Sequence, residues 1–180
     1  MRSKKILTKD YILNIAEDVF AEYGIKDSTL AKIAKKAKIS KGTLYYYYSA
    51  KKDIILDVAD RHLNIINENI KNFSNALKNK ALLNNSIKEL FLKVFINSNY
   101  NSIHLSILSE ATKDKELKEK INVLNMEWLS YIENSLKKYC KVGSEKCSGI
   151  AQIILSVINS SSFHTKNSLE DISVIIAEIL

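Results

Sequence analysis

The sequence predicts an all-α fold, in which an N-terminal head of three helices is followed by a helical bundle, for about nine helices in total. The chain of 180 residues has no proline and only four glycines, so little interrupts its helices. Apolar residues recur at helical spacing along most of the chain, and no segment alternates as an exposed strand does. A composition of 46% hydrophobic and 26% charged residues suits one or two folded cores.

The head begins with a helix predicted over residues 8–23, whose apolar residues form one stripe at helical spacing. Thr8 is a suitable N-cap, because its hydroxyl can accept a hydrogen bond from a free backbone N–H of the first turn. Gly24 suits the position just past the end of the helix, where a left-handed backbone is common.

Two shorter helices complete the head. The segment LAKIAKKA, residues 30–37, reads as a helix capped by Ser28 or Thr29. A third helix is predicted from Lys41 to about Tyr48, with Ser40 as its cap. Two short helices joined by a tight connection, with another helix packed behind them, have the layout of a helix-turn-helix, whose second helix enters the major groove of DNA.

The remainder of the chain reads as the bundle. A fourth helix begins near Lys51 and extends for about five turns or more. Polar joints divide the rest into predicted helices at residues 82–97, 102–112, 114–140, 145–164 and 168–180. We therefore expect two domains, a head at residues 1–50 and a body at residues 51–180.

Positive charge is concentrated in the head. Residues 1–53 contain 12 Lys and Arg against 6 Asp and Glu, whereas residues 54–180 contain 15 against 14. A basic segment beside a nearly neutral remainder indicates a polyanionic partner for the first part only. The alternative is a lysine-rich surface that is simply solvated, so charge alone does not decide between the two.

The third helix has two chemically different faces. Leu44 is expected to point inward, and a rotation of about 100° per residue turns Tyr48 inward as well. Tyr47 lies at the flank, where its direction is ambiguous. The residues on the outer side are Lys41, Gly42, Tyr45 and Tyr46. They combine a cation, a glycine that permits close approach of the backbone, and rings that carry hydroxyls, which suits phosphates, base edges and thymine methyls.

Hydroxyls and helix ends add to this face. Ser40 and Thr43 offer short donors for phosphate, and Lys51 begins a helix whose free N–H groups also favour an anion. The complete set predicted to contact DNA is Thr29, Ser40, Lys41, Gly42, Thr43, Tyr45, Tyr46, Tyr47 and Lys51.

The order of residues across the head also carries a family resemblance. The segment STLAKIAKKAKISKGTLYYYYSAKKDIIL, preceded by AEDVFAEYGIKDST, resembles the TetR family of transcriptional repressors over about residues 8–60. The matching positions are Phe20, Gly24, Thr29, Ile33, Ala34, Ala37, Ser40, Gly42, Leu44, Tyr45 and Lys51. Two positions depart from the family pattern, since Lys38 stands where Gly is usual and Tyr48 where Phe is usual. A left-handed Lys38 would cost roughly 1 kcal/mol relative to glycine.

The resemblance implies a cytoplasmic homodimer that binds a palindromic double-stranded DNA operator with the third helix of each subunit. The body would then hold a small-molecule pocket and the dimer face, and the effector would release the operator. The resemblance thus implies a regulator, an enzyme is not expected, and neither is a cofactor, a metal or a membrane partner.

The body offers candidates for the effector pocket and the dimer face. The pocket candidates are Phe91, Phe95, Tyr100, His104, Trp128 and Tyr131, which would suit an apolar or cationic ligand. Ordinary core packing is the alternative for each of them. The predicted dimer face consists of stripes from the last two helices, namely Ile150, Ile153, Ile154, Val157, Ile158 and Ser161, and Leu169, Ile172, Ile176 and Ile179. The alternative is that both stripes are buried within one subunit.

Two other functions compete with this one. A DNA-binding regulator of the same fold could be controlled by a partner protein, in which case the body would have a filled core. An enzyme is disfavoured, because the sequence has no phosphate-binding glycine loop, no HExxH and no GxSxG motif. Cys140 and Cys147 fit no metal or redox spacing and are expected to be reduced, and the N-terminus lacks the apolar stretch of a secretory signal.

Overall fold

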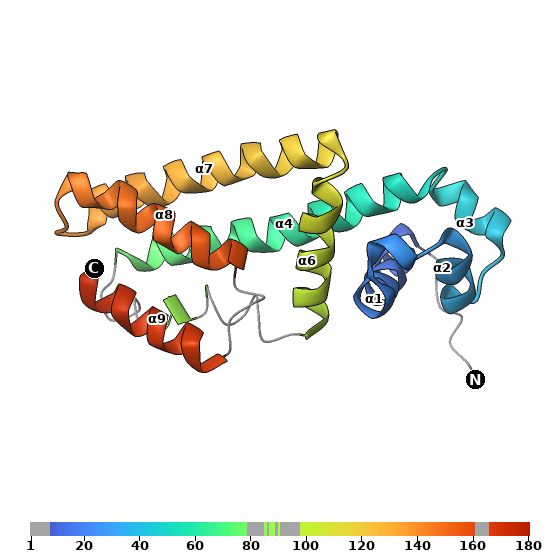
Figure 1. Cartoon of the computed structure of the whole chain (residues 1–180), viewed down its shortest axis with the longest axis horizontal. Helices are drawn as coiled ribbons and strands as arrows, with labels where there is room; N and C mark the ends of the chain where they lie inside the picture. The colour runs from blue at the N-terminus through green and yellow to red at the C-terminus, as the bar shows by residue number, and fades with distance from the viewer. Residues whose placement is uncertain (1–7, 79–84, 86, 89, 91–97, 161–165) are drawn as a thin grey trace.

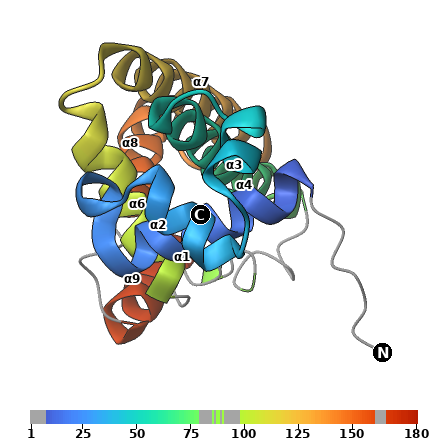
Figure 2. The same cartoon turned by 90° about the vertical axis from the view of Figure 1, so that its right-hand side faces the viewer.

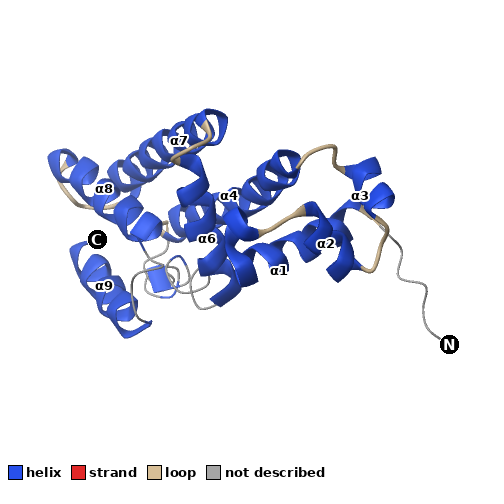
Figure 3. Cartoon of the chain, turned by 45° about the vertical axis from the view of Figure 1, so that its right-hand side comes forward, coloured by secondary structure: helices blue, strands red, loops and turns tan. Residues whose placement is uncertain are grey.

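The computed structural model describes residues 8–78, 85, 87–88, 90, 98–160 and 166–180, and this part of the chain contains helices and no strand (Figure 3). The helices are α1 (Lys9–Asp27), α2 (Leu30–Ala37), α3 (Lys41–Tyr47), α4 (Lys51–Ala76), α6 (Ser98–Ala111), α7 (Lys115–Tyr139), α8 (Ser144–Ser160) and α9 (Lys166–Ile179). The all-α prediction is confirmed. Most of the helix predicted at residues 82–97 lies outside the described residues, as do Phe91, Phe95, Ser161 and the basic residues before Thr8.

Helix α4 runs through the whole molecule (Figure 1). Its first turns lie beside α1, α2 and α3, and its later turns lie among the helices of the body. Helix α7 packs along α8, and α6 stands across the molecule between head and body, where it makes its most extensive contacts with α1. Viewed from the head end, α1, α2 and α3 come to the front (Figure 2). None of the helices among the described residues has the length and apolarity needed to cross a membrane.

The helix starts in the head are set by hydroxyl caps, as the sequence predicts. The side chains of Thr8, Thr29 and Ser40 each accept a hydrogen bond from the backbone N–H three residues later, at 3.1, 3.2 and 3.0 Å. Each of these bonds satisfies a donor that the helix itself leaves without a partner. Gly24 has φ 71°, which is not a helical value, and it produces a kink inside α1. Helical structure resumes after the kink and ends at Asp27.

Lys38 ends α2 in a left-handed conformation, with φ 58° and ψ 40°. Its backbone N–H donates to the carbonyl of Lys35 at 3.1 Å, and Ile39 N–H donates to the carbonyl of Ala34 at 3.0 Å. These bonds close the end of α2 and turn the chain directly into α3. The strained conformation costs roughly 1 kcal/mol relative to glycine, and the packing of α2 against α3 maintains it.

The inner side of the head belongs to an apolar core that continues into the body. Leu44 of α3 is fully buried against the core cluster that includes Ile12, Phe20 and Ile33. Tyr48 is 2% exposed, and its hydroxyl donates to Oδ2 of Asp57 on α4 at 2.9 Å. The inward orientation predicted for Leu44 and Tyr48 is confirmed, and the buried tyrosine hydroxyl has the partner that its burial requires.

A pair of buried histidines joins α4 to α6. Nε2 of His62 and Nδ1 of His104 are 2.8 Å apart, and the side chains are only 3% and 2% exposed. Burial, its largest cause, lowers the pKa of His62 well below its usual value, and the neighbouring His104 lowers that pKa further. Burial also lowers the pKa of His104. At neutral pH both rings are therefore neutral, and one donates a hydrogen bond to the other.

This pair predicts that the protein loses stability in mild acid. In the unfolded chain both histidines titrate near pH 6.5, whereas in the folded chain they resist protonation, so the unfolded state binds more protons below that pH. We expect the free energy of unfolding to fall by about 1–2 kcal/mol between pH 7.5 and 5.5. Urea denaturation at the two pH values measures the change.

The matched control is the double variant His62→Gln/His104→Asn, which keeps one donor and one acceptor at the contact but no titratable ring. Its loss of stability over the same pH range should be clearly smaller. Glu17, whose pKa burial raises, acts with the opposite sign and is present in both proteins, so it cancels in the comparison. Equal pH dependence in the two proteins would refute the assignment to this pair.

Candidate nucleic-acid interface

The outward face of α3 is exposed and chemically varied. Tyr45 and Tyr46 are 54% and 84% exposed, which is unusual for large aromatic side chains. Lys41 and Gly42 are also exposed, at the first turn of the helix. Because Leu44 and Tyr48 fix the opposite side in the core, the four outward residues are presented on a rigid support.

A groove of about 470 Å³ lies beside this face, between the start of α2 and α3. Four of the residues predicted to contact DNA line it, namely Thr29, Lys41, Tyr45 and Lys51. They come from the cap of α2, two turns of α3 and the start of α4. The fold therefore places residues from three helices around one surface. Such an arrangement suits contacts with the phosphate backbone of DNA.

The hydroxyls of Ser40 and Thr43 form a small unit at the start of α3. Ser40 Oγ accepts from the Thr43 backbone N–H, and the two hydroxyl oxygens are 2.7 Å apart. The bond between the two hydroxyls uses only one of their two protons. The other hydroxyl proton remains for a further acceptor, such as a phosphate oxygen.

Space around Gly42 is open. A Cβ atom placed on this residue would meet only Ser40 Oγ, at 3.8 Å, which is an ordinary van der Waals distance. Its backbone is not in the left-handed region, so neither strain nor crowding inside the chain requires glycine here. Glycine would be required at this position if another molecule approached the backbone closely.

Two of the predicted contacts are engaged within the head. The Lys51 ammonium donates to the carbonyl of Lys26 at 3.3 Å, and partial burial lowers the pKa of Lys51. Tyr47 is half-buried against the core and meets Tyr46 edge to face, with ring centroids 5.2 Å apart. Their contacts with DNA stay predictions, as do those of the other seven residues.

The body candidates separate into two groups. Tyr100, His104 and Trp128 contribute to the interior, and Trp128 Nε1 donates to Asn67 Oδ1 at 3.2 Å. Tyr131 is 43% exposed on α7, one turn after Trp128. The first three could border an effector pocket, whereas Tyr131 would need a ligand or partner at the surface of α7.

The predicted dimer stripes are largely covered within one subunit. Ile150, Ile154, Val157 and Ile158 of α8 and Leu169 and Ile176 of α9 are buried in the chain's own core. The prediction that these six residues face a partner was wrong. The apolar face that their helical spacing identifies is buried against other helices of the same subunit. Among the apolar residues of α8 and α9 that stay exposed, Ile153 and Ile179 belong to the predicted stripes, whereas Val174 and Ile175 do not.

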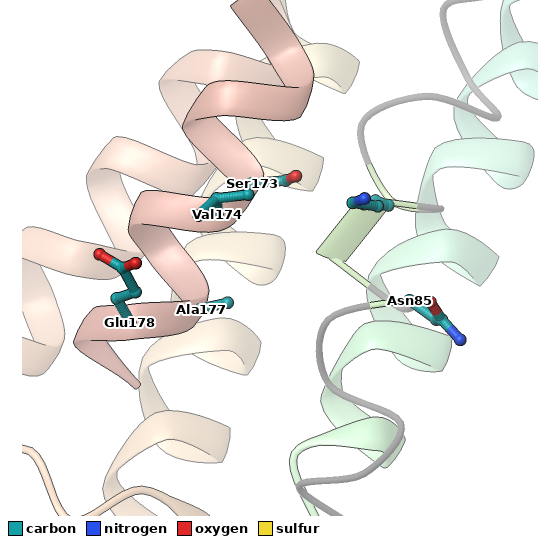
Figure 4. Close-up of a pocket in the computed structure, with 6 residues that line it drawn as sticks. Asn85, Ser173, Val174, Ala177 and Glu178 are labelled. Atoms are coloured by element: carbon teal, nitrogen blue, oxygen red, sulfur yellow. The ribbon is translucent and has the colours of Figure 1, made fainter.

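A groove of about 430 Å³ borders this exposed surface (Figure 4). Ser173 and Ala177 lie on the side of α9 that faces Asn85, with Lys88 also lining the groove. Its mixture of amide, ammonium, hydroxyl and small apolar groups defines no single ligand.

Sequence reasoning missed the residues that attach the head to α4. Arg61 contacts Asp10, Asn14 and Glu17 of α1, and its neighbour His62 contacts α6. The only local signal is the i, i+4, i+7 spacing of the three α1 residues, which places them on one helix face. Nothing local connects that face to Arg61.

Comparison with known proteins supports the interpretation of the head. Residues 12–58 match the family described as bacterial regulatory proteins, tetR family. The match begins inside α1 and ends in the second turn of α4, so it includes the complete helix-turn-helix and its support.

The similarity extends into the body. The fatty acid metabolism regulator protein of Bacillus subtilis is 26% identical over 137 residues, which cover 75% of this chain and 69% of the relative. The structure of a Clostridium perfringens protein, named as a candidate regulator of fatty acid metabolism, is 26% identical and has a TM-score of 0.63. It covers 94% of this chain and 98% of that one.

A further structure shares the fold at lower identity. The transcriptional regulator FadR of Bacillus subtilis, in complex with stearoyl-CoA, has a TM-score of 0.67 and 22% identity, with 96% of this chain and 97% of that chain covered. The head of this chain is thus the DNA-binding domain of a TetR-family transcription regulator, and the FadR structure shares the fold of the whole chain.

Proposed function

We propose that this protein is a ligand-responsive homodimer that binds a two-part operator with α3 and releases it when an acyl-CoA occupies the body. The observation that carries the DNA-binding part is the outward face of α3, where Lys41, Gly42, Tyr45 and Tyr46 are exposed while Leu44 and Tyr48 anchor the helix. Because DNA lies in the cytoplasm of bacteria, we place the protein there as well.

The exposed apolar residues of α8 and α9 support the homodimer. A soluble chain rarely leaves several isoleucines about half exposed on neighbouring helices, as Ile153, Ile175 and Ile179 are. Two helices from each subunit would form a four-helix contact across a two-fold axis. Such symmetry matches an operator with two related halves.

The acyl-CoA proposal comes from the relatives. The match to the Bacillus subtilis fatty acid regulator spans 137 residues, which is longer than the whole head, so the similarity includes the body. The FadR structure of the same fold was determined with stearoyl-CoA. An acyl chain agrees with the apolar effector expected from the sequence, whereas a cationic effector receives no support from these relatives.

The effector proposal is tested on a labelled operator selected from random DNA with the protein. Stearoyl-CoA should weaken operator binding about tenfold or more, measured by fluorescence anisotropy. Free CoA and stearate serve as controls, and each should act less than the thioester. If no acyl-CoA between eight and about eighteen carbons weakens binding, the effector proposal fails and control by a partner protein becomes the better account.

A glycine substitution tests the docking of α3. Gly42→Ala should stabilise the free protein by about 0.5–1 kcal/mol, because alanine is the better helix former and the site is open. The added methyl should nevertheless weaken operator binding, by roughly tenfold, because it occupies space needed by a base edge. Thermal melting and operator anisotropy give the two values.

Gly149→Ala on α8 is the matched control, since a Cβ there also meets nothing within 4 Å. It should stabilise the protein without altering affinity for the operator. An operator affinity of Gly42→Ala equal to that of the wild type would show that α3 does not dock by its first turn.

Charged substitutions test the dimer face. Ile153→Asp/Ile175→Asp places carboxylates on the exposed apolar surface of α8 and α9, where a buried partner contact could not accommodate them. Light scattering should give the mass of one 20.5 kDa chain in place of two. Met126→Asp on α7, where the side chain is 73% exposed, should stay dimeric. A double variant that keeps the dimer mass would place the interface elsewhere.

A further inference from the structure

Helix α4 is attached to the head and to the body at consecutive residues. The guanidinium of Arg61 contacts three side chains of α1, and the ring of His62 contacts α6. These two helices also pack on each other, and a cleft of about 300 Å³, lined in part by Arg61, His62 and Tyr100, lies where the three meet.

Arg61 holds α1 across two turns. Nη2 is 3.1 Å from Oδ1 of Asp10, and Nη1 is 3.3 Å from Oε1 of Glu17 and also donates to Oδ1 of Asn14. A planar guanidinium with donors in fixed directions can satisfy several acceptors only at one relative orientation of the two helices. The contact therefore defines the angle between α1 and α4 as well as their distance.

Stability alone does not explain this contact. The Asp10 side chain is 88% exposed, so water and salt screen its ion pair with Arg61. Apolar packing also holds the head, since its buried residues belong to the core cluster shared with the body, and Asp57, one turn earlier on α4, binds Lys9 at 2.6 Å and the Tyr48 hydroxyl at 2.9 Å. The additional contribution of Arg61 is geometric, since it fixes α1 further along α4.

His62, the residue after Arg61, attaches α4 to α6 of the body. Its ring stacks on Tyr100 with centroids 4.0 Å apart, and its backbone carbonyl accepts from the Tyr100 hydroxyl at 3.1 Å. With the 2.8 Å contact to His104, three interactions fix this part of α4 to α6. A displacement of α6 relative to α4 therefore acts on the helix directly beside Arg61.

We propose that Arg61 is a positioning residue, which sets the orientation of the head on α4 and thereby the spacing of the two operator halves that the dimer accepts. The operator part of this inference rests on the proposed function. Arg61 touches no DNA in this account. It acts through α1, which packs on α2, and α2 in turn packs on α3, so the position of α1 affects where the outward face of α3 stands.

The operator test compares DNA duplexes that carry the selected half-sites with their separation kept, shortened by one base pair or lengthened by one base pair. Wild type should strongly prefer the selected separation. Arg61→Gln should bind that operator roughly tenfold more weakly, and its affinities for the three separations should become more nearly equal. The dimer mass and the helical content should not change.

Two further variants separate orientation from charge. Arg61→Lys can engage only one of the three partners at a time, so it should restore part of the affinity and less of the spacing preference. Lys71→Gln removes an ion pair with Glu68 that lies within α4 itself and should leave both values unchanged. A uniform loss of affinity in Arg61→Gln, with wild-type spacing preference, would reduce Arg61 to a structural role and overturn the inference.

A measurement without DNA keeps the inference independent of the proposed function. A dye attached at Lys35→Cys on exposed α2 reports motion of the head through its nanosecond anisotropy decay. Arg61→Gln should increase the amplitude of this motion, and Lys71→Gln should not. Unchanged motion in Arg61→Gln overturns the role of Arg61, whereas a wild type that selects no operator overturns the proposed function alone.

Discussion

The attachment of α4 to α1 on one side and to α6 on the other is the constraint on which the rest of this structure depends. Arg61 and His62 make those attachments at neighbouring positions, and α1 and α6 close the arrangement by packing on each other. The head is thus not a loose appendage, because its buried apolar residues belong to the same core cluster as those of the body. The contacts of Arg61 add polar, partly exposed interactions to this packing, and they are easier to rearrange than the apolar packing itself.

The DNA-binding surface depends on this attachment indirectly. Leu44 and Tyr48 fix the inner side of α3, so the outward residues cannot turn relative to the head, and their position is set by the head as a whole. Tyr48 also connects the core of the head to α4, because its hydroxyl donates to Asp57 of that helix. In the proposed dimer, small changes in the body would decide whether an operator is accepted, since the proposed effector needs only to favour a different orientation of the heads.

The sequence predicted what local rules control. Hydroxyl caps mark the starts of α1, α2 and α3, and the 100° rotation per residue divides the four tyrosines into exposed Tyr45 and Tyr46, half-buried Tyr47 and buried Tyr48. Contacts between distant residues escaped prediction. Arg61 lies 44 to 51 residues from its partners in α1, and His62 lies 42 from His104. Most residues of the predicted dimer stripes are buried within the subunit for a related reason, because periodicity identifies an apolar face without showing whether the chain's own helices cover it.

The distance between the two heads of the dimer tests the central claim most directly. Spin labels at Lys35→Cys would report it by electron–electron double resonance, with half-buried Cys140 replaced by serine and Cys147 protected by burial. The account predicts one narrow distance distribution on the operator and a displaced one with stearoyl-CoA. The same distribution in both states, or no distance between labels at all, would contradict it.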